Sequence, residues 1–332
     1  MGVRAGGRPD APLRPLLLEV DADRGLVLGA LRWETDPRHL SGPDADQEFT
    51  AASVTSRGTL LQPTHTEVLE LDGGRVVRVI SHPLMHSVHS AHERPGGGLV
   101  VSSAGNDSVL ELDDDGALIA HHWLRDGDFA AAYPGVTDFR RAHHDAFKPH
   151  SHHPNRASYV DGERWVTCFE QRACLSSEGR RIGFPEGIPH DGVLRDGLLW
   201  FTLVDGLVIA VDPRSLRRER VIDLNRLDGR PGLLGWCRGV EVVGSRLVVG
   251  MSALRRTRHR EVVRILLRGR HGVKRPSRLV EIDLERERIV REIELGNAAG
   301  GTIYGVSKSP WGSTGWPAPT EPSTARPISL FT

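Results

Sequence analysis

Histidine is the residue type in this chain whose pattern points most directly to chemistry. Eleven of the sixteen histidines lie between His82 and His153, and another follows at His190 within Ile188–Gly192. Histidine is usually scattered and half-buried, so packing alone does not explain this density. Several neutral imidazoles brought together are a common way to hold a transition metal. The pattern therefore indicates a metal site, provided that the fold brings the rings together.

The elements that would have to position these histidines are short strands. Apolar runs are punctuated by Gly and Asp along the chain, and helical periodicity is scarce. One unit recurs: a strand that ends in Asp, a tight turn whose geometry Asp and Gly tolerate, and then a second strand. It begins at residues 66, 108, 207 and 278.

A further pair of strands lies upstream in each unit, at 16–31, 88–103, 155–168, 190–203 and 237–251. The pair at 16–31 is grouped with the hairpin that begins at 66, and the second hairpin of the third unit, which begins with the pair at 155–168, is degenerate. The chain thus holds about five copies of a four-stranded unit, and repeats of roughly 40 residues with four antiparallel strands are typical of β-propellers. We predict an all-β fold, a β-propeller of four-stranded blades, with five blades counted. The stretch 303–307 leaves a sixth blade open. Insertions at 32–64, 125–151 and 255–275 should lie on the end faces.

Composition limits the other classes of function. The 43 basic and 43 acidic residues balance, which gives no overall attraction to nucleic acid, and no apolar run is long enough to span a membrane. No secretory signal is evident, and Cys168, Cys174 and Cys237 are an odd number without metal-finger spacing, so we expect a cytoplasmic protein. Residues 1–308 should form the propeller domain, followed by a tail at 309–332 rich in Pro, Ser and Thr.

Aligning the first strand of each unit by its following turn indicates where the histidines go. In a propeller this strand lines the central channel, so equivalent positions in successive blades form a ring. Near the start of these strands the alignment places Asn155, His190 and Cys237, with His153 two residues before Asn155 and with Ser90 flanked by His89 and His92. We therefore predict that His89 or His92, His153 and His190 bind a metal, and the pattern does not decide between His89 and His92.

An imidazole set without an obligatory carboxylate suits Fe(II), Zn, Mn, Ni or Cu better than Ca or Mg. We expect a divalent transition metal, with Fe(II) favoured and Zn or Mn as alternatives. Asp191 and Glu241 are candidates to orient the imidazoles, and Arg238 could bind an anionic substrate. His144 or water could complete the ligands, although His143 and His144 in the 125–151 insertion fit a solvated loop better.

The strand pattern over residues 16–306 resembles single-domain propellers such as the SMP-30/gluconolactonase, NHL and streptogramin-lyase proteins. That resemblance implies a metal and a substrate at one mouth of the channel. The gluconolactonase site is rich in carboxylates and Asn, whereas the matching positions here carry histidine. A histidine ring is closer by analogy to carotenoid cleavage oxygenases, propellers that hold Fe(II) with four histidines, and 147–157 is loosely similar to one of their histidine motifs.

We therefore expect a metal-dependent enzyme that oxidises or oxygenates a small organic molecule. A Zn- or Mn-dependent lyase or hydrolase on the same site is the first alternative. A non-catalytic propeller that binds a protein or glycan through its end-face loops is the second. No serine-hydrolase elbow, Walker A or dinucleotide fingerprint is present, which argues against those enzyme classes. The arginine-rich segment 255–278 could bind a polyanion or simply be solvated.

Overall fold

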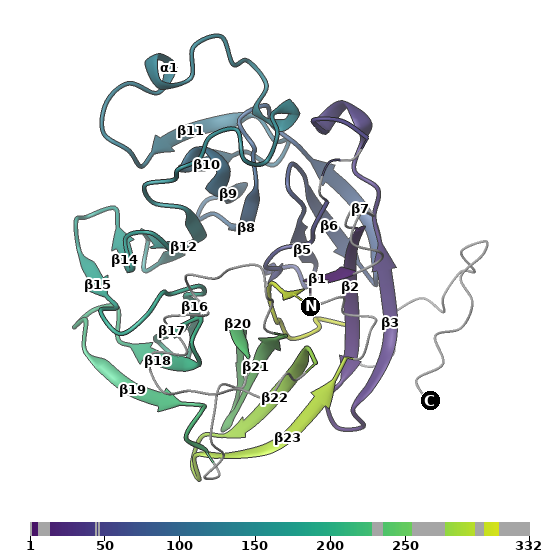
Figure 1. Cartoon of the computed structure of the whole chain (residues 1–332), viewed down its shortest axis with the longest axis vertical. Coiled ribbons are helices and arrows are strands. Elements are labelled where there is room, and N and C mark those ends of the chain that lie inside the picture. Colours follow the sequence, from purple (N-terminus) through teal and green to yellow (C-terminus); the bar gives the residue numbers. More distant parts are fainter. Residues whose placement is uncertain are drawn as a thin grey trace.

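The computed structural model of the chain describes residues 2–5, 14–43, 45, 47–227, 235–253, 276–295 and 302–311. Within these residues, six four-stranded antiparallel sheets are arranged around a central axis (Figure 1). Helical structure is limited to one short α-helix and three 3-10 turns in the described part. The predicted β-propeller of four-stranded blades is therefore confirmed.

Five of the blades are each formed by four consecutive strands. They are β4 (Ser53–Val54), β5 (Leu60–Pro63), β6 (Val68–Asp72) and β7 (Arg75–Ile80); β8 (Val88–Glu93), β9 (Leu99–Ser103), β10 (Ser108–Leu112) and β11 (Leu118–Trp123); β12 (Pro154–Val160), β13 (Glu163–Cys168), β14 (Ala173–Ser176) and β15 (Arg181–Gly183); β16 (Val193–Arg195), β17 (Leu198–Thr202), β18 (Leu207–Val211) and β19 (Arg218–Asp223); and β20 (Trp236–Val243), β21 (Arg246–Ser252), β22 (Arg278–Asp283) and β23 (Arg288–Glu294).

The sixth four-stranded sheet joins segments from both ends of the chain. Its order is β24 (Thr302–Ile303), β1 (Gly2–Ala5), β2 (Arg14–Asp21) and β3 (Leu26–Arg32). The sixth blade that the sequence left open is thus present. The hairpin at 16–31 belongs to this sheet, so grouping it with the hairpin at 66–80 was wrong. The cause is that the predicted 32–64 insertion itself contains β4 and β5, which complete the other blade.

The innermost strands of neighbouring blades approach one another so closely that glycine is needed at two of the contacts. A β-carbon on Gly239 would lie 2.5 Å from the backbone nitrogen of Val306, and one on Gly305 would lie 2.8 Å from the α-carbon of Ala51. Gly239 also has a φ of +78°, which other residues seldom adopt. Residues 305–306, which follow β24, therefore pack against Gly239 of β20 on one side and against Ala51, which precedes β4, on the other. These two contacts close the ring of blades.

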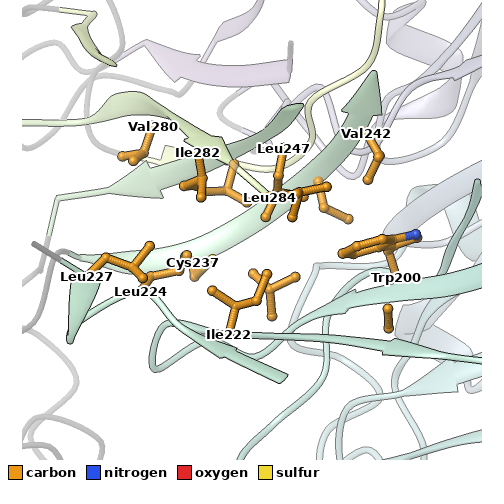
Figure 2. Packing of buried hydrophobic residues seen from close by; sticks show 14 of the residues in the cluster. Trp200, Ile222, Leu224, Leu227, Cys237, Val242, Leu247, Val280, Ile282 and Leu284 are labelled. Atoms are coloured by element: carbon orange, nitrogen blue, oxygen red, sulfur yellow. The ribbon is translucent and has the colours of Figure 1, made fainter. Parts of the chain in front are cut away.

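Hydrophobic cores lie between adjacent blades, because the two middle strands of the five blades from β4 to β23 are largely buried. Figure 2 shows the largest such cluster, where Trp200 and Ile222 of one blade meet Cys237, Leu247 and Ile282 of the next. Outer strands such as β3 and β7 instead alternate between exposed and half-buried residues, as expected for strands with one solvated face. The cores hold the blades at fixed angles and thereby fix the positions of the inner strands.

The insertion at 125–151 is folded over the blade β8–β11. It contains α1 (Phe129–Ala132) and the 3-10 turn η3 (Phe139–Arg141). Phe129, Tyr133, Phe139 and Phe147 form an aromatic cluster with ring centres 5.0–5.3 Å apart. This packing gives the loop a core of its own, so it can carry side chains in defined positions.

Two predicted segments fall largely outside the described residues: most of 255–278 and, in the tail, 312–332. Of the tail, Ser309 donates a hydrogen bond to Glu19 at 3.3 Å and Trp311 packs against a core that includes Leu17 and Phe49.

No helix in the described part of the chain has both the length and the apolar character needed to cross a membrane.

Candidate functional site

Three of the predicted ligands meet where successive inner strands begin. His89 is the second residue of β8, His153 directly precedes β12, and His190 lies in the approach to β16. The ring centres of His89 and His153 are 4.8 Å apart, and those of His89 and His190 are 6.4 Å apart. The fold therefore brings together imidazoles that lie as much as a hundred residues apart in the sequence, as the ring argument predicted. We call these three residues the channel histidines.

Asp107 positions His153, a role that the sequence reasoning missed. Its carboxylate accepts hydrogen bonds from the backbone N–H groups of Ser151, His152 and His153 at 2.8, 3.1 and 2.6 Å. His153 has a φ of +50°, a left-handed conformation that a residue with a side chain adopts only when its surroundings enforce it. The buried Asp107 carboxylate supplies that enforcement and thereby orients the His153 ring.

Asn155 connects His89 to the next blade. Its Oδ1 lies 3.0 Å from Nδ1 of His89, and its Nδ2 donates a hydrogen bond of 3.2 Å to the carbonyl of Pro189. Because Pro189 immediately precedes His190, the same amide links the strand of His89 to the segment that carries His190. Asn155 is thus a shared support for two of the channel histidines.

His190 is buried and its two ring nitrogens have no hydrogen-bond partner among the described protein groups. Its Nδ1 lies 3.7 Å from Oδ1 of Asp191, beyond hydrogen-bond distance. Oδ2 of Asp191 instead accepts hydrogen bonds from the Thr202 hydroxyl and from the backbone N–H of Gly239, the latter at 2.9 Å. Asp191 therefore lies beside His190, where it was predicted, but bonds chiefly to the neighbouring strands.

The channel histidines are neutral at physiological pH. Burial lowers the pKa of His89 from its ordinary value of 6.5 to about 3, and the neighbouring His190 and Arg238 also disfavour protonation of His89. Burial and the neighbouring His89 hold the pKa of His153 well below its ordinary value. Burial and Arg238 also lower the pKa of His190. Neutral imidazoles have a lone pair available, so they can bind a metal ion or accept a proton.

Arg238, on β20, supplies positive charge to this end of the channel. Its guanidinium carbon lies 5.6 Å from the ring centre of Trp236 and 5.4 Å from that of Tyr304. A guanidinium between two aromatic rings is held in place by cation–π contacts. Arg238 was predicted from the sequence, whereas the two rings were not: Trp236 lies on the same strand and Tyr304 follows β24.

The structure places His92 and Glu241 away from the channel histidines. His92 lies three residues further along β8 than His89, and burial together with Arg156 and Arg195 lowers its pKa. The Glu241 carboxylate pairs with Arg195 at 2.8 and 3.1 Å and accepts a bond from the backbone N–H of Lys308 at 3.3 Å. The bonds of Glu241 thus do not support a role in orienting a histidine, and of His89 and His92 it is His89 that lies beside His153 and His190.

Close spacing of ligand atoms occurs in a different cluster. In the described part of the chain, His143, His144 and Asp145 form the group whose ligand atoms all lie within 4.8 Å of one another. The ligand nitrogens of the three channel histidines, taken as a set, are spaced more widely than the ligand atoms of this cluster. Near the cluster is a cavity of about 350 Å³, between the loops at 40–45 and 140–144, which is also lined by His65 and His86.

Comparisons with known proteins establish the fold and no closer kinship. No family model matches the chain, and no curated protein matches it. A protein of unknown function from Bacteroides caccae aligns at 16% identity over 90% of this chain and 96% of its own, with a TM-score of 0.56.

Two further solved structures have the same architecture. A streptogramin B lyase aligns at 13% identity over 89% of this chain and 85% of its own, with a TM-score of 0.51. The WD40 propeller domain of Doa1 aligns at 12% identity over 93% and 84%, also with a TM-score of 0.51. The resemblance to single-domain propellers is therefore confirmed at the level of the fold.

Proposed function

We propose that this propeller is a metal-dependent enzyme whose active site is the channel mouth, where His89, His153 and His190 hold a divalent transition metal. The observation that carries the proposal is the convergence of three neutral imidazoles, of which buried His190 has no protein hydrogen-bond partner among the described residues on either ring nitrogen. An unsatisfied buried polar group is costly, and a bound metal ion would supply the partner that this ring lacks.

The spacing of the rings is compatible with a shared ion. A metal–nitrogen bond of about 2.1 Å places imidazole centres about 3.2 Å from the ion, and hence about 4.5–6.4 Å from one another. The observed separations of 4.8 and 6.4 Å lie within that range. The nitrogens themselves are not within 4.8 Å as a set, so binding requires a side-chain rotation of at least one ring. Imidazole ligands suit Fe, Zn, Cu and Ni.

Of the reaction classes that the sequence left open, we favour a lyase acting on a small molecule with an anionic or carbonyl group. When bound, the ion would act as a Lewis acid toward a substrate oxygen. A channel histidine that does not ligate the ion at that stage would accept the proton from the carbon next to the carbonyl, and Arg238 would stabilise the negative charge that develops. The electron pair would then form a double bond to the adjacent carbon as the bond from that carbon to the leaving group breaks and the leaving group departs with its electron pair. The similarity of fold to a streptogramin B lyase supports this choice.

Fe(II)-dependent oxygenation is the second candidate. The observation that favours it is the ligand set itself, which consists of imidazole nitrogens and lacks a carboxylate, since Asp191 bonds to Thr202 and Gly239. In this case Arg238 would bind the anionic part of the substrate rather than stabilise a developing charge. The protein residues are the same, so the identity of the ion and the readout of turnover separate the two candidates.

One experiment distinguishes these reaction classes. Protein loaded separately with Fe(II), Zn or Mn is incubated in D₂O with a panel of small carboxylic acids and esters. Deuterium exchange next to the carbonyl, followed by NMR, reports proton abstraction, whereas an oxygen electrode reports oxygenation. Exchange that is lost in Arg238→Met supports the lyase. Oxygen uptake with Fe(II) alone supports the oxygenase. If neither activity is detected and the protein captures a protein or glycan ligand, the result would contradict both enzyme candidates and support a non-catalytic binding propeller.

We propose the cytoplasm as the compartment, on the basis of the cysteines. Cys168, Cys174 and Cys237 are all free and buried, and burial raises the pKa of the Cys174 thiol to about 12. Such thiols behave as small apolar side chains and form no stabilising disulfide. Fractionation of the native host cell would test this, and recovery outside the cytoplasm would contradict it.

A further inference from the structure

The loop that follows η3 carries a cluster of ligands outside the channel. His143, His144 and Asp145 are consecutive, and their ligand atoms all lie within 4.8 Å of one another. The ring centres of the two histidines are 4.5 Å apart, and Nε2 of His144 lies 3.1 Å from Oδ2 of Asp145. Two imidazoles and one carboxylate are a donor set that binds divalent transition metals and leaves coordination positions open.

The ligand atoms in this cluster are accessible. The side chains of His144 and Asp145 are 39% and 47% exposed. The backbone N–H of Asp145 donates to Nδ1 of His143 over 3.3 Å, so this nitrogen has its lone pair directed into the loop. Coordination would replace that long and weak bond with a metal–nitrogen bond. The loop itself is anchored through the aromatic cluster, because Phe147 packs on Phe139 and Tyr133.

Lys148 already neutralises the carboxylate of this cluster. Its ammonium donates to Oδ1 of Asp145, and the two residues are three positions apart in the loop. A metal ion that binds Asp145 would therefore compete with the Lys148 ammonium for this carboxylate.

The cluster also lies beside a partly open cavity. His143 and His144 line the cavity of about 350 Å³ together with Leu40 and Arg140. Open coordination positions on an ion bound here would be close to a cavity that can admit water or a small anion.

From this geometry we propose that His143, His144 and Asp145 form a second transition-metal site, of the Zn²⁺ or Ni²⁺ class, in which Lys148 competes with the ion for Asp145. The site is separate from the channel histidines and does not rest on the function proposed for them.

Calorimetric titration of the full chain with Ni²⁺ at pH 7.5 tests this proposal. We expect His143→Ala/His144→Ala to remove one binding event from the titration of the parent protein, while His153→Ala/His190→Ala leaves that event in place. Both loop histidines lie in an accessible loop outside the hydrophobic cores, and circular dichroism would confirm that the variant is folded. A titration that His143→Ala/His144→Ala leaves unchanged would overturn the proposal.

The competing role of Lys148 has its own readout. Because an exposed ion pair is worth about 0.2–1 kcal/mol, Lys148→Met should tighten Ni²⁺ binding at this site by about 1.4- to fivefold. The matched control is Lys308→Met, which removes an exposed lysine whose described contact is made by its backbone. Equal Ni²⁺ affinity in Lys148→Met and Lys308→Met would contradict the competition.

Discussion

Nδ1 of His89 lies 3.0 Å from Oδ1 of Asn155, and the amide nitrogen of Asn155 is already committed to the carbonyl of Pro189. Since the Asn155 oxygen can only accept, Nδ1 of His89 must carry the proton. Nε2 of His89 then has the lone pair. One amide therefore decides which nitrogen of His89 is available to a metal or a substrate.

This relationship predicts a single tautomer. Long-range ¹H–¹⁵N NMR of histidine-labelled protein should show His89 protonated at Nδ1, and Asn155→Ala should convert it to a mixture. The variant should also lose about 1–3 kcal/mol of unfolding free energy, because the Pro189 carbonyl is left without this bond. A parent protein in which His89 is protonated at Nε2 would contradict the assignment.

Asp107 should determine the position of His153 through hydrogen bonds to the backbone rather than to the imidazole ring. Asp107→Ala removes three backbone hydrogen bonds and one from the Ser151 hydroxyl, so we expect a loss on the order of 2–4 kcal/mol in unfolding free energy and weaker metal binding at the channel histidines. Denaturant unfolding and metal titration measure the two effects. Asp115→Ala, in an exposed turn of the same blade, is the matched control and should change neither.

The stability of the fold should fall in mild acid. The unfolded chain has ordinary histidines, whereas burial lowers the pKa of His89 to about 3 and that of His86 to about 4. Between pH 6.5 and about 4 the unfolded state therefore binds more protons, so the free energy of unfolding decreases as the pH falls through this range.

His89→Gln should flatten that dependence. One histidine contributes at most ~1.4 kcal/mol per pH unit, and the variant removes that contribution. His143→Gln, in an exposed loop, provides the comparison and should keep the slope of the parent protein. Urea unfolding between pH 4.5 and 7.5 measures all three proteins, and identical slopes for His89→Gln and the parent would contradict a buried, neutral His89.

Closure of the ring should depend on Gly239. A β-carbon there would lie 2.5 Å from Val306 N, so Gly239→Ala must separate two inner strands, at a cost of about 1–3 kcal/mol beyond the strain of its positive φ. Gly244→Ala isolates that strain, because Gly244 has a φ of +58° with nothing within 4 Å. Equal loss of thermal stability in the two variants would show that the contact is unimportant.

Much of the fold and part of the site follow from local sequence rules. Alternating apolar residues and Asp-Gly turns define the hairpins, and their repetition places His153 and His190 at strand starts. The choice between His89 and His92 did not follow, because a β-bulge between Val88 and Ser90 shifts the register of β8. Such a bulge changes which side chains face the axis and leaves no clear sequence signal.

Other features depend on contacts between distant segments. A second bulge, between Arg238 and Val240, shifts the register of β20, on which Glu241 pairs with Arg195 of the neighbouring blade. The sixth blade requires β1 and β24, short strands from opposite ends of the chain. Asp107 supports His153 across 46 residues, which no local pattern could indicate.

The most direct test of the account is the metal content of the channel mouth. Protein carrying His143→Ala/His144→Ala, which removes the loop cluster, would be purified anaerobically without chelator and compared with the same protein carrying His153→Ala/His190→Ala in addition. We predict about one equivalent of a divalent transition metal per chain in the first protein and almost none in the second. Equal metal content in the two proteins, including after reconstitution, would contradict a metal centre formed by the channel histidines.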